Sequence, residues 1–166
     1  SCRETGRPFV FPGSPEQYNA ATDVTDSRIL ARQIEWAATS PAAANKALNI
    51  VNGDIFRWRK MWPMIAENLG VEPAPYPGEP TPLVEQMADM EIVWNGIVAK
   101  HNLQPYPIDK LASWWHSDAD LGRKIEAFTD MSKSRRLGFL EYQETPGSFR
   151  DLFDRLRAKR IIPPRK

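Results

Sequence analysis

The chain has 166 residues, of which 42% are hydrophobic and 26% are charged, and its formal net charge at pH 7 is +1. This composition is typical of a globular domain and excludes a disordered or fibrous chain. The single cysteine, Cys2, excludes an internal disulfide and favours a reducing, cytoplasmic location. No apolar stretch approaches the roughly 20 residues that cross a bilayer, so we expect no membrane partner.

The first third of the chain is predicted to contain two short strands and a helix. We expect a strand over 8–11, and then a helix over 26–39 with Thr25 as its N-cap. A second strand is expected over 47–51. It ends at Asn52-Gly53-Asp54, which we interpret as a turn and a helix cap and not as catalytic residues.

The rest of the chain is predicted to be helical. A helix over 57–69 contains Pro63 and ends at Gly70, and the five prolines of 71–82 then form an extended connection with a short strand at its start. Further helices are predicted over 82–88, 90–102, 108–115, 118–126, 131–137 and 148–160.

Three residues are expected to end or cap the last of these helices. Asp130 is the expected cap of the helix over 131–137, Gly138 its left-handed end, and Ser148 the cap of the final helix. The sequence therefore predicts one domain over 1–166, of the α+β class and predominantly helical, with two or three short strands.

The basic segment 150–166 has seven cations and two acids. Its apolar residues recur with the spacing of an amphipathic helix, so we expect the cations on the outer face of that helix. Basic stripes that bind nucleic acid usually come with aromatic residues or a recognisable motif, and this segment has neither. We predict no nucleic-acid partner.

We predict no catalytic, metal-binding or cofactor-binding residues in the chain. Two histidines and one cysteine give no tetrahedral set for a metal, and no two of the nine glycines have the spacing of a dinucleotide-binding loop. Tyr106 and Lys110 have the Tyr-x-x-x-Lys spacing of short-chain dehydrogenases. Because Pro105 and Pro107 flank the tyrosine, we interpret this match as a coincidence.

The candidate substrate-pocket residues are Trp114, Trp115, His116 and Asp118. Neighbouring residues of a helix point about 100° apart, so this stretch alone cannot form a catalytic triad. Trp114 or Trp115 can offer a flat apolar wall and His116 a polar contact. The alternative is that both tryptophans simply fill the core.

The segment from Ala47 to Leu69, with Asn52-Gly-Asp54, Phe56-x-Trp58 and Trp62, resembles the progesterone 5-beta-reductase and iridoid synthase-like enzymes. These are atypical members of the extended short-chain dehydrogenase superfamily. Other stretches agree with the carboxyl-terminal half of that family in the same order: Phe11-x-Gly13, Thr22-Asp23-x-Thr25-Asp26, Trp36-Ala37-Ala38, Trp114-Trp115, Met131-Ser-Lys-Ser134 and Gly138-Phe139.

This resemblance implies a parent protein whose amino-terminal Rossmann domain binds NADP or NAD and carries the catalytic tyrosine and lysine. This chain would be its carboxyl-terminal substrate-binding part, with 47–51 as an edge strand of the missing Rossmann sheet. The helices after residue 70 would then cover a small-molecule substrate. The implied reaction is hydride transfer to an enone-type or carbonyl compound. His116 stands where the plant enzymes have an aromatic or apolar residue, which argues against a steroid-like substrate.

Because the chain begins without methionine, we expect it to be a fragment that is inactive in isolation. A chain that has lost a partner domain should also expose an apolar patch and self-associate. Two alternatives stay open at this point. One is the same region of a nucleoside-diphosphate-sugar epimerase or dehydratase, and the other is a stand-alone helical interaction module.

Overall fold

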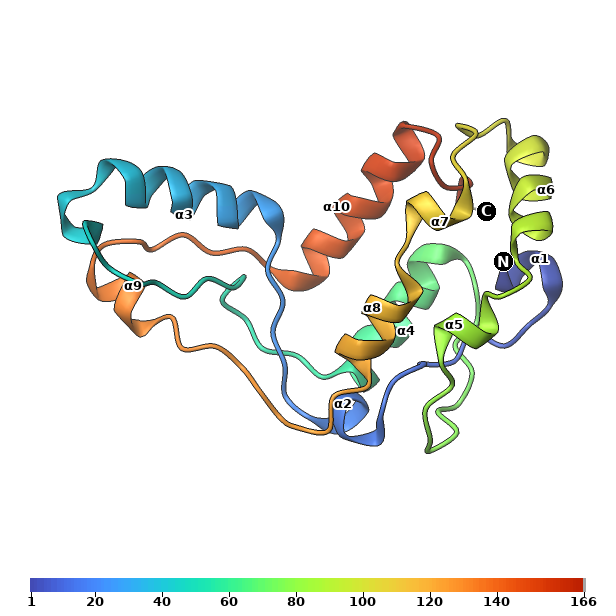
Figure 1. Cartoon of the computed structure of the whole chain (residues 1–166), viewed down its shortest axis with the longest axis horizontal. Coiled ribbons are helices and arrows are strands. Elements are labelled where there is room, and N and C mark those ends of the chain that lie inside the picture. The colour runs from blue at the N-terminus through green and yellow to red at the C-terminus, as the bar shows by residue number, and fades with distance from the viewer. Residues whose placement is uncertain (166) are drawn as a thin grey trace.

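The computed structural model describes residues 1–165, and these form helices joined by long irregular connections (Figure 1). The elements are α1 (Cys2–Thr5), α2 (Pro15–Asn19), α3 (Ser27–Thr39), the 3-10 helix η1 (Pro41–Ala43), α4 (Trp58–Leu69), α5 (Leu83–Gln86), α6 (Glu91–His101), α7 (Ile108–Leu111), α8 (Trp114–Leu121), α9 (Ser132–Arg136) and α10 (Thr145–Ala158). No helix in this part of the chain is long and apolar enough to cross a membrane.

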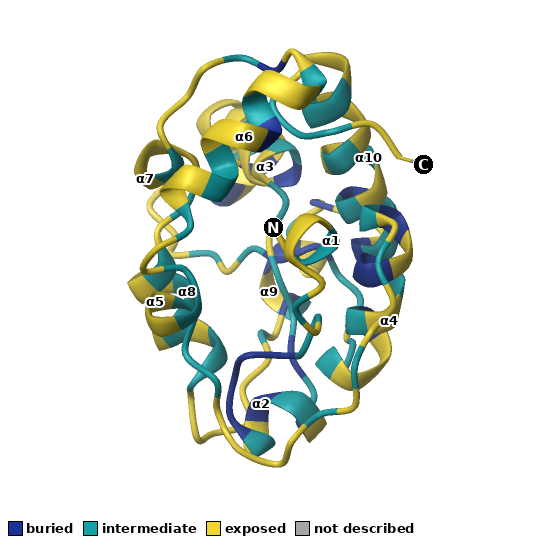
Figure 2. Cartoon of the chain, turned by 90° about the vertical axis from the view of Figure 1, so that its right-hand side faces the viewer, coloured by how far each residue is buried: buried dark blue, intermediate teal, exposed yellow. Residues whose placement is uncertain are grey.

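The chain divides into two unequal regions. Figure 1 shows α3, α9 and the connections beside them at one end, which we call the α3 region (residues 23–54 and 129–144). The other described residues form the helical region. Figure 2 shows this region with α1 and the amino terminus in front of a ring made by the other helices.

The prediction of regular strands is wrong. Within residues 1–165, β-pairing is limited to two isolated bridges, one parallel between Phe9 and Pro73 and one antiparallel between Thr22 and Phe56. The strand predicted over 8–11 is reduced to the first bridge, because the prolines at both ends of Phe9-Val-Phe11 have no amide hydrogen to donate. The helical dominance is confirmed, and the short strands are not.

Side chains take the place of a neighbouring strand along 47–51. The Asn49 carbonyl accepts hydrogen bonds from Gln33 Nε2 and Ser134 Oγ, both at 3.1 Å, and the Ile50 carbonyl accepts one from Thr25 Oγ1 at 3.1 Å. Val51 is buried in a small apolar core with Ile29, Met131 and Phe139, against which Trp36 and Ile50 pack. The segment is therefore extended and anchored to α3 and α9, without a strand partner in this chain.

Helix α3 forms as predicted, but its cap is the next residue along. The Asp26 carboxylate accepts a hydrogen bond from the Arg28 amide at 2.9 Å, so Asp26 and not Thr25 is the N-cap. The Arg28 guanidinium also lies 2.6 Å from this carboxylate and 2.5 Å from that of Asp151 on α10. The hydrogen bond from the Arg28 side chain holds the pKa of Asp26 far below its ordinary value.

The turn at 52–54 has the structural role that we predicted, and it also joins the two regions. Asn52 is fully buried; its Oδ1 accepts from the Asp26 amide at 2.6 Å, and its Nδ2 donates to Thr145 Oγ1 at 2.9 Å. Gly53 has φ 108°, in the left-handed region that favours glycine. Asp54 accepts from the Thr145 amide at 2.8 Å and from the Thr145 hydroxyl.

This cap explains why α10 begins at Thr145 and not at the predicted residue 148. Because Asp54 satisfies the Thr145 amide across 91 positions of sequence, the helix starts one turn earlier than its local residues indicate. Both ends of α9 agree with the prediction more closely. The Asp130 carboxylate accepts from the Ser132 amide at 2.7 Å, and Gly138 has φ 104°.

The helical region is built on aromatic contacts around Phe11, which is 1% exposed. Its ring contacts those of Tyr18, Trp58, Trp62 and Tyr76 at centroid distances between 5.4 and 5.9 Å. Helix α4 supplies both tryptophans, runs through Pro63 without a break, and ends at Gly70 in the left-handed conformation as predicted. These contacts fix α2 and α4 to the segment that leads into the cavity described below.

Candidate functional site: an apolar cavity in the helical region

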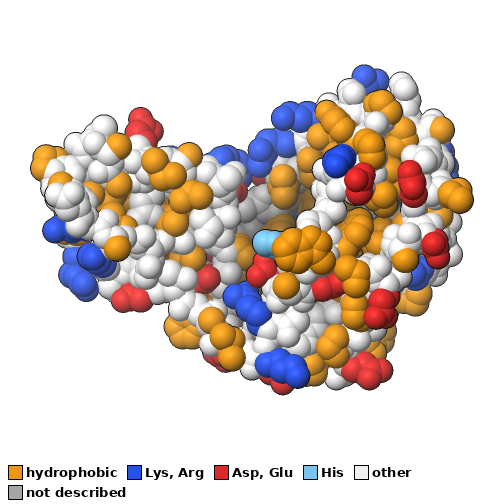
Figure 3. Space-filling view, viewed as in Figure 1, with side chains coloured by type: hydrophobic (Ala, Val, Ile, Leu, Met, Phe, Trp, Pro, Cys, Tyr) orange, Lys and Arg blue, Asp and Glu red, His pale blue; other side chains and the backbone are white. Residues whose placement is uncertain are grey.

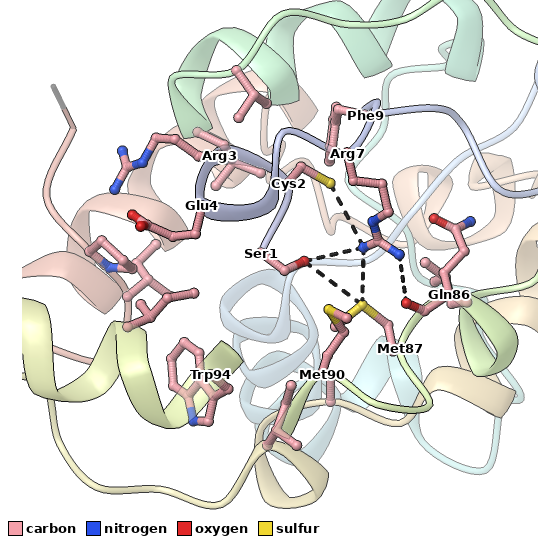
Figure 4. Close-up of a pocket in the computed structure, with 18 of the residues that line it drawn as sticks. Ser1, Cys2, Arg3, Glu4, Arg7, Phe9, Gln86, Met87, Met90 and Trp94 are labelled. Atoms are coloured by element: carbon pink, nitrogen blue, oxygen red, sulfur yellow. Dashed lines mark hydrogen bonds between the residues drawn. The ribbon is translucent and has the colours of Figure 1, made fainter. Parts of the chain in front are cut away.

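An apolar cavity of about 420 Å³ lies among α1, α4, α5, α6, α7 and α8 (Figure 4). This volume is within the range of small-molecule sites, about 300–1,000 Å³. Most of the wall is made of large apolar side chains, among them Phe9, Trp62, Met87, Met90, Trp94 and Trp114. Methionine and tryptophan walls adapt to flat or irregular apolar molecules.

One side of the cavity is held by the contact between Phe9 and Trp62. Their rings stack with centroids 4.5 Å apart and an interplanar angle of 6°. The Phe9 carbonyl accepts hydrogen bonds from the Ala74 amide at 3.0 Å and from Trp62 Nε1 at 3.4 Å. The proline-rich connection is thereby fixed to α4, which keeps both rings in the wall.

The opposite side depends on Asp118, which we predicted to be a pocket residue. Its carboxylate accepts hydrogen bonds from the amides of Leu83 at 2.7 Å and Val84 at 2.9 Å, and so caps the first turn of α5. Asp118 does not line the cavity. It holds α8 against α5 and thus keeps Trp114 in the cavity wall.

Trp115 and His116 lie away from the cavity, on the exposed face of α8. Trp115 is 68% exposed, and its ring meets that of His116 edge to face at 5.4 Å. His116 Nε2 lies 3.4 Å from the Asp120 carboxylate. The alternative that both tryptophans fill the core is therefore wrong for Trp115. The face drawn in Figure 3 is hollowed between the two regions, with hydrophobic side chains on both sides of the hollow.

The predicted helices over 108–115 and 118–126 divide differently in the structure, as α7 (Ile108–Leu111) and α8 (Trp114–Leu121). This shift puts the candidate residues at the start of one helix, where successive side chains point in different directions. The structure accordingly distributes the four candidates among the cavity wall, a cap and the outer surface. A substrate contact by Trp115 or His116 stays a prediction.

The polar part of the cavity comes from α1 and Arg7, which sequence reasoning missed. Arg7 Nη1 donates to the Gln86 carbonyl at 2.6 Å, and Nη2 lies 3.2 Å from Ser1 Oγ and 3.4 Å from Met87 Sδ. These contacts join residues about eighty positions apart. No local signal marks them, since Arg7 sits in a polar stretch before a proline.

Glu4 is the acid in this wall, and it is already paired. Its carboxylate lies 2.7 Å from Lys100 Nζ and 3.7 Å from His101 Nε2, both at the end of α6. The hydrogen bond from Lys100 lowers the pKa of Glu4, so the carboxylate stays ionised on that side of α1.

Comparison with known proteins identifies relatives of the chain. No protein-family model matches it. It is 36% identical over 163 residues to an (S)-8-oxocitronellyl enol synthase of Antirrhinum majus, and 35% identical over 164 residues to a 3-oxo-Delta(4,5)-steroid 5-beta-reductase of Arabidopsis thaliana. Each match covers 98% of this chain and 42% of the relative. Over nearly its whole length the chain is thus similar to part of the progesterone 5-beta-reductase and iridoid synthase-like enzymes.

This similarity confirms the resemblance seen in the sequence, and the chain spans less than half the length of those relatives. Tyr106 precedes α7, and its carbonyl accepts from Trp94 Nε1 at 2.8 Å, while Lys110 lies 3.6 Å from the Asp109 carboxylate. That the Tyr-x-x-x-Lys spacing is a coincidence stays a prediction. Residues 1–165 also contain no group of three or more His, Cys, Asp or Glu residues placed to hold a metal.

Proposed function

We propose that this chain is the substrate-binding region of an NAD(P)-dependent oxidoreductase that reduces an enone-type or carbonyl substrate. The observation that carries the proposal is the match of 98% of the chain to relatives named as a steroid 5-beta-reductase and as enol synthases. A 3-oxo-Delta(4,5)-steroid is a conjugated enone, and an oxocitronellyl compound carries a carbonyl group. The apolar cavity suits the carbon skeleton of such molecules.

We assign the nucleotide and the reacting groups to a part of the protein outside these residues. A dinucleotide site needs a strand that leads through a glycine-rich turn to the amino terminus of a helix. The described residues contain no such arrangement, and we assign NADP or NAD to a Rossmann domain outside them. The role of the chain is then to bind and shield the substrate, and it is inactive in isolation.

We further propose that the partner of the chain is an amino-terminal Rossmann domain that docks on the α3 region. Ile34 on α3 is 60% exposed, Leu140 is 76% exposed, and the ion pair between Arg32 and Glu141 at 2.7 Å holds the two segments together. The amides of 47–51 donate to no other backbone group. An extended segment with unpaired amides is suited to join the edge of a sheet.

Trp115 and His116 support the same arrangement. Both project from the exposed face of α8, and a docked domain would remove the apolar surface of Trp115 from water. We assign these two residues to the part of the substrate chamber that the docked domain completes, and Trp114 to the part that this chain forms alone.

The test of the function is NADPH oxidation by the full-length protein. We expect turnover with a cyclic enone or an unsaturated aldehyde, and a loss of about tenfold or more in kcat/KM for Trp114→Ala, because a large apolar contact is lost. Turnover of nucleoside-diphosphate sugars alone would instead support the epimerase or dehydratase alternative. A full-length protein that neither oxidises NADPH with an enone or an unsaturated aldehyde nor epimerises or dehydrates a nucleoside-diphosphate sugar would contradict both enzymatic hypotheses.

The test of the docking surface is the association state of the isolated chain. We expect light scattering to show an average mass that rises with concentration, and Ile34→Glu to reduce that rise by putting a charge in the exposed patch. Glu35→Gln, on the same helix, is the matched control and should leave association unchanged. A strictly monomeric wild-type chain at all concentrations argues against this surface.

A further inference from the structure

Arg7 brings a positive charge to the cavity without a negative partner. Its guanidinium contacts one carbonyl, one hydroxyl and two sulfur atoms, all of them neutral (Figure 4). Its Nε atom is buried and has no hydrogen-bond partner among the described residues. Arg7 as a whole is half-buried. A buried polar atom normally has a hydrogen-bond partner, so this guanidinium is suited to receive an acceptor from outside the chain.

The acid in the cavity wall is not available to Arg7. Glu4 is held by Lys100 at 2.7 Å, and Figure 4 shows its carboxylate on the far side of α1 from the Arg7 guanidinium. Arg3, which also belongs to the wall, donates to the Pro164 carbonyl at 3.3 Å and points away from Arg7. Among the described residues, Arg7 is therefore a cation of the wall that lies against the sulfur atoms of Cys2 and Met87 and has no carboxylate partner.

We propose that the cavity binds an apolar molecule that carries one carboxylate, with the carboxylate on Arg7 and the carbon skeleton among Met90, Trp94 and Trp114. A carboxylate can accept two parallel hydrogen bonds from the Nε and Nη2 edge of a guanidinium, and would replace the weak contacts to sulfur. This inference rests on the proposed function for the cavity and adds that its substrates are acids.

Cys2 supplies a reporter for binding. Its Sγ lies 3.8 Å from Arg7 Nη2, and the chain has no other cysteine. A molecule seated on Arg7 should slow the alkylation of this thiol by iodoacetamide. We expect decanoate to protect Cys2 in the 166-residue chain at concentrations about tenfold lower than 1-decanol, which has the same chain length and no charge.

Two variants and two small anions complete the experiment. Arg7→Gln should remove the preference for the acid, and Arg3→Gln, the matched control in the same wall, should keep it. Acetate and inorganic phosphate should not protect, because they lack the apolar body. Equal protection by decanoate and 1-decanol in the wild-type chain overturns the inference without reference to any variant. A preference that survives in Arg7→Gln, or protection by phosphate at the concentrations at which decanoate protects, overturns it as well.

The failure of this inference is distinguishable from failure of the proposed function. Protection is measured without nucleotide and without turnover, so a full-length protein inactive on enones leaves the acid preference intact. Equal binding of acid and alcohol, in turn, leaves a reductase of neutral substrates standing.

Discussion

The two regions of this molecule are stabilised by different kinds of interaction. The α3 region has a small apolar core and buried polar side chains that bond to partners distant in sequence, as Asn52 does to Asp26 and Thr145. The helical region depends on contacts between aromatic rings and contains an apolar cavity lined in part by Arg7. Dense polar pairing suits a surface that must present a fixed shape to a partner, and adaptable apolar walls suit a chamber for a ligand.

The largest expected effect on stability tests the aromatic contacts of the helical region. Phe11→Ala removes the ring that contacts four other aromatic side chains in the helical region and should lower the free energy of unfolding by about 3–5 kcal/mol. Urea denaturation followed by tryptophan fluorescence measures it. Phe128→Ala, at a position 57% exposed, is the control and should change stability by less than about 0.5 kcal/mol. Similar losses in the two variants would contradict the aromatic core.

The next largest effect on stability tests the buried hydrogen bonds of the α3 region. Asn52→Ala removes the acceptor of the Asp26 amide and the donor to the Thr145 hydroxyl oxygen in a fully buried site, and should lower the free energy of unfolding by about 2–4 kcal/mol. Asn95→Ala, at an exposed position of α6, should be nearly neutral. If the Asn52 variant were as stable as the Asn95 variant in urea, the joint between the two regions would not depend on this network.

A smaller effect is expected at the cap that shapes the cavity. Asp118→Ala removes the acceptor of two amides at the start of α5 and should lower stability by about 1–2 kcal/mol. It should also weaken protection of Cys2 by decanoate, since α5 carries part of the wall. Asp120→Ala removes an exposed carboxylate that contacts only His116 and serves as the control. An Asp118 variant indistinguishable from the control would argue against the cap.

The smallest effect concerns pH. The folded-state pKa of Asp26 lies below its unfolded value, so ionised Asp26 stabilises the chain fully above pH of about 4, and this contribution is lost as pH falls toward the folded-state pKa. Thermal unfolding between pH 5 and pH 2.5 should show a decline in Tm that is shallower in Asp26→Asn, which has no carboxyl group to titrate. Parallel declines in the two proteins would mean that other groups control acid stability.

The comparison also explains what the sequence could predict. Helices α3 and α4 were predicted to within a residue at each end, because apolar spacing and terminal residues such as Gly70 are local signals. The start of α10, the cap made by Asp118 and the hydrogen bond from Arg7 to Gln86 depend on residues 34 to 91 positions apart, and no local pattern encodes them. The strand over 47–51 was predicted from β-branched residues, but a strand also needs a neighbour, which this chain does not supply.

We propose that these residues bind the substrate and that another part of the protein binds the nucleotide. Calorimetric titration of the 166-residue chain with NADPH, and separately with NADH, tests this claim most directly. We predict no heat of binding above dilution for either nucleotide. Saturable binding of either one in the micromolar range would contradict the account.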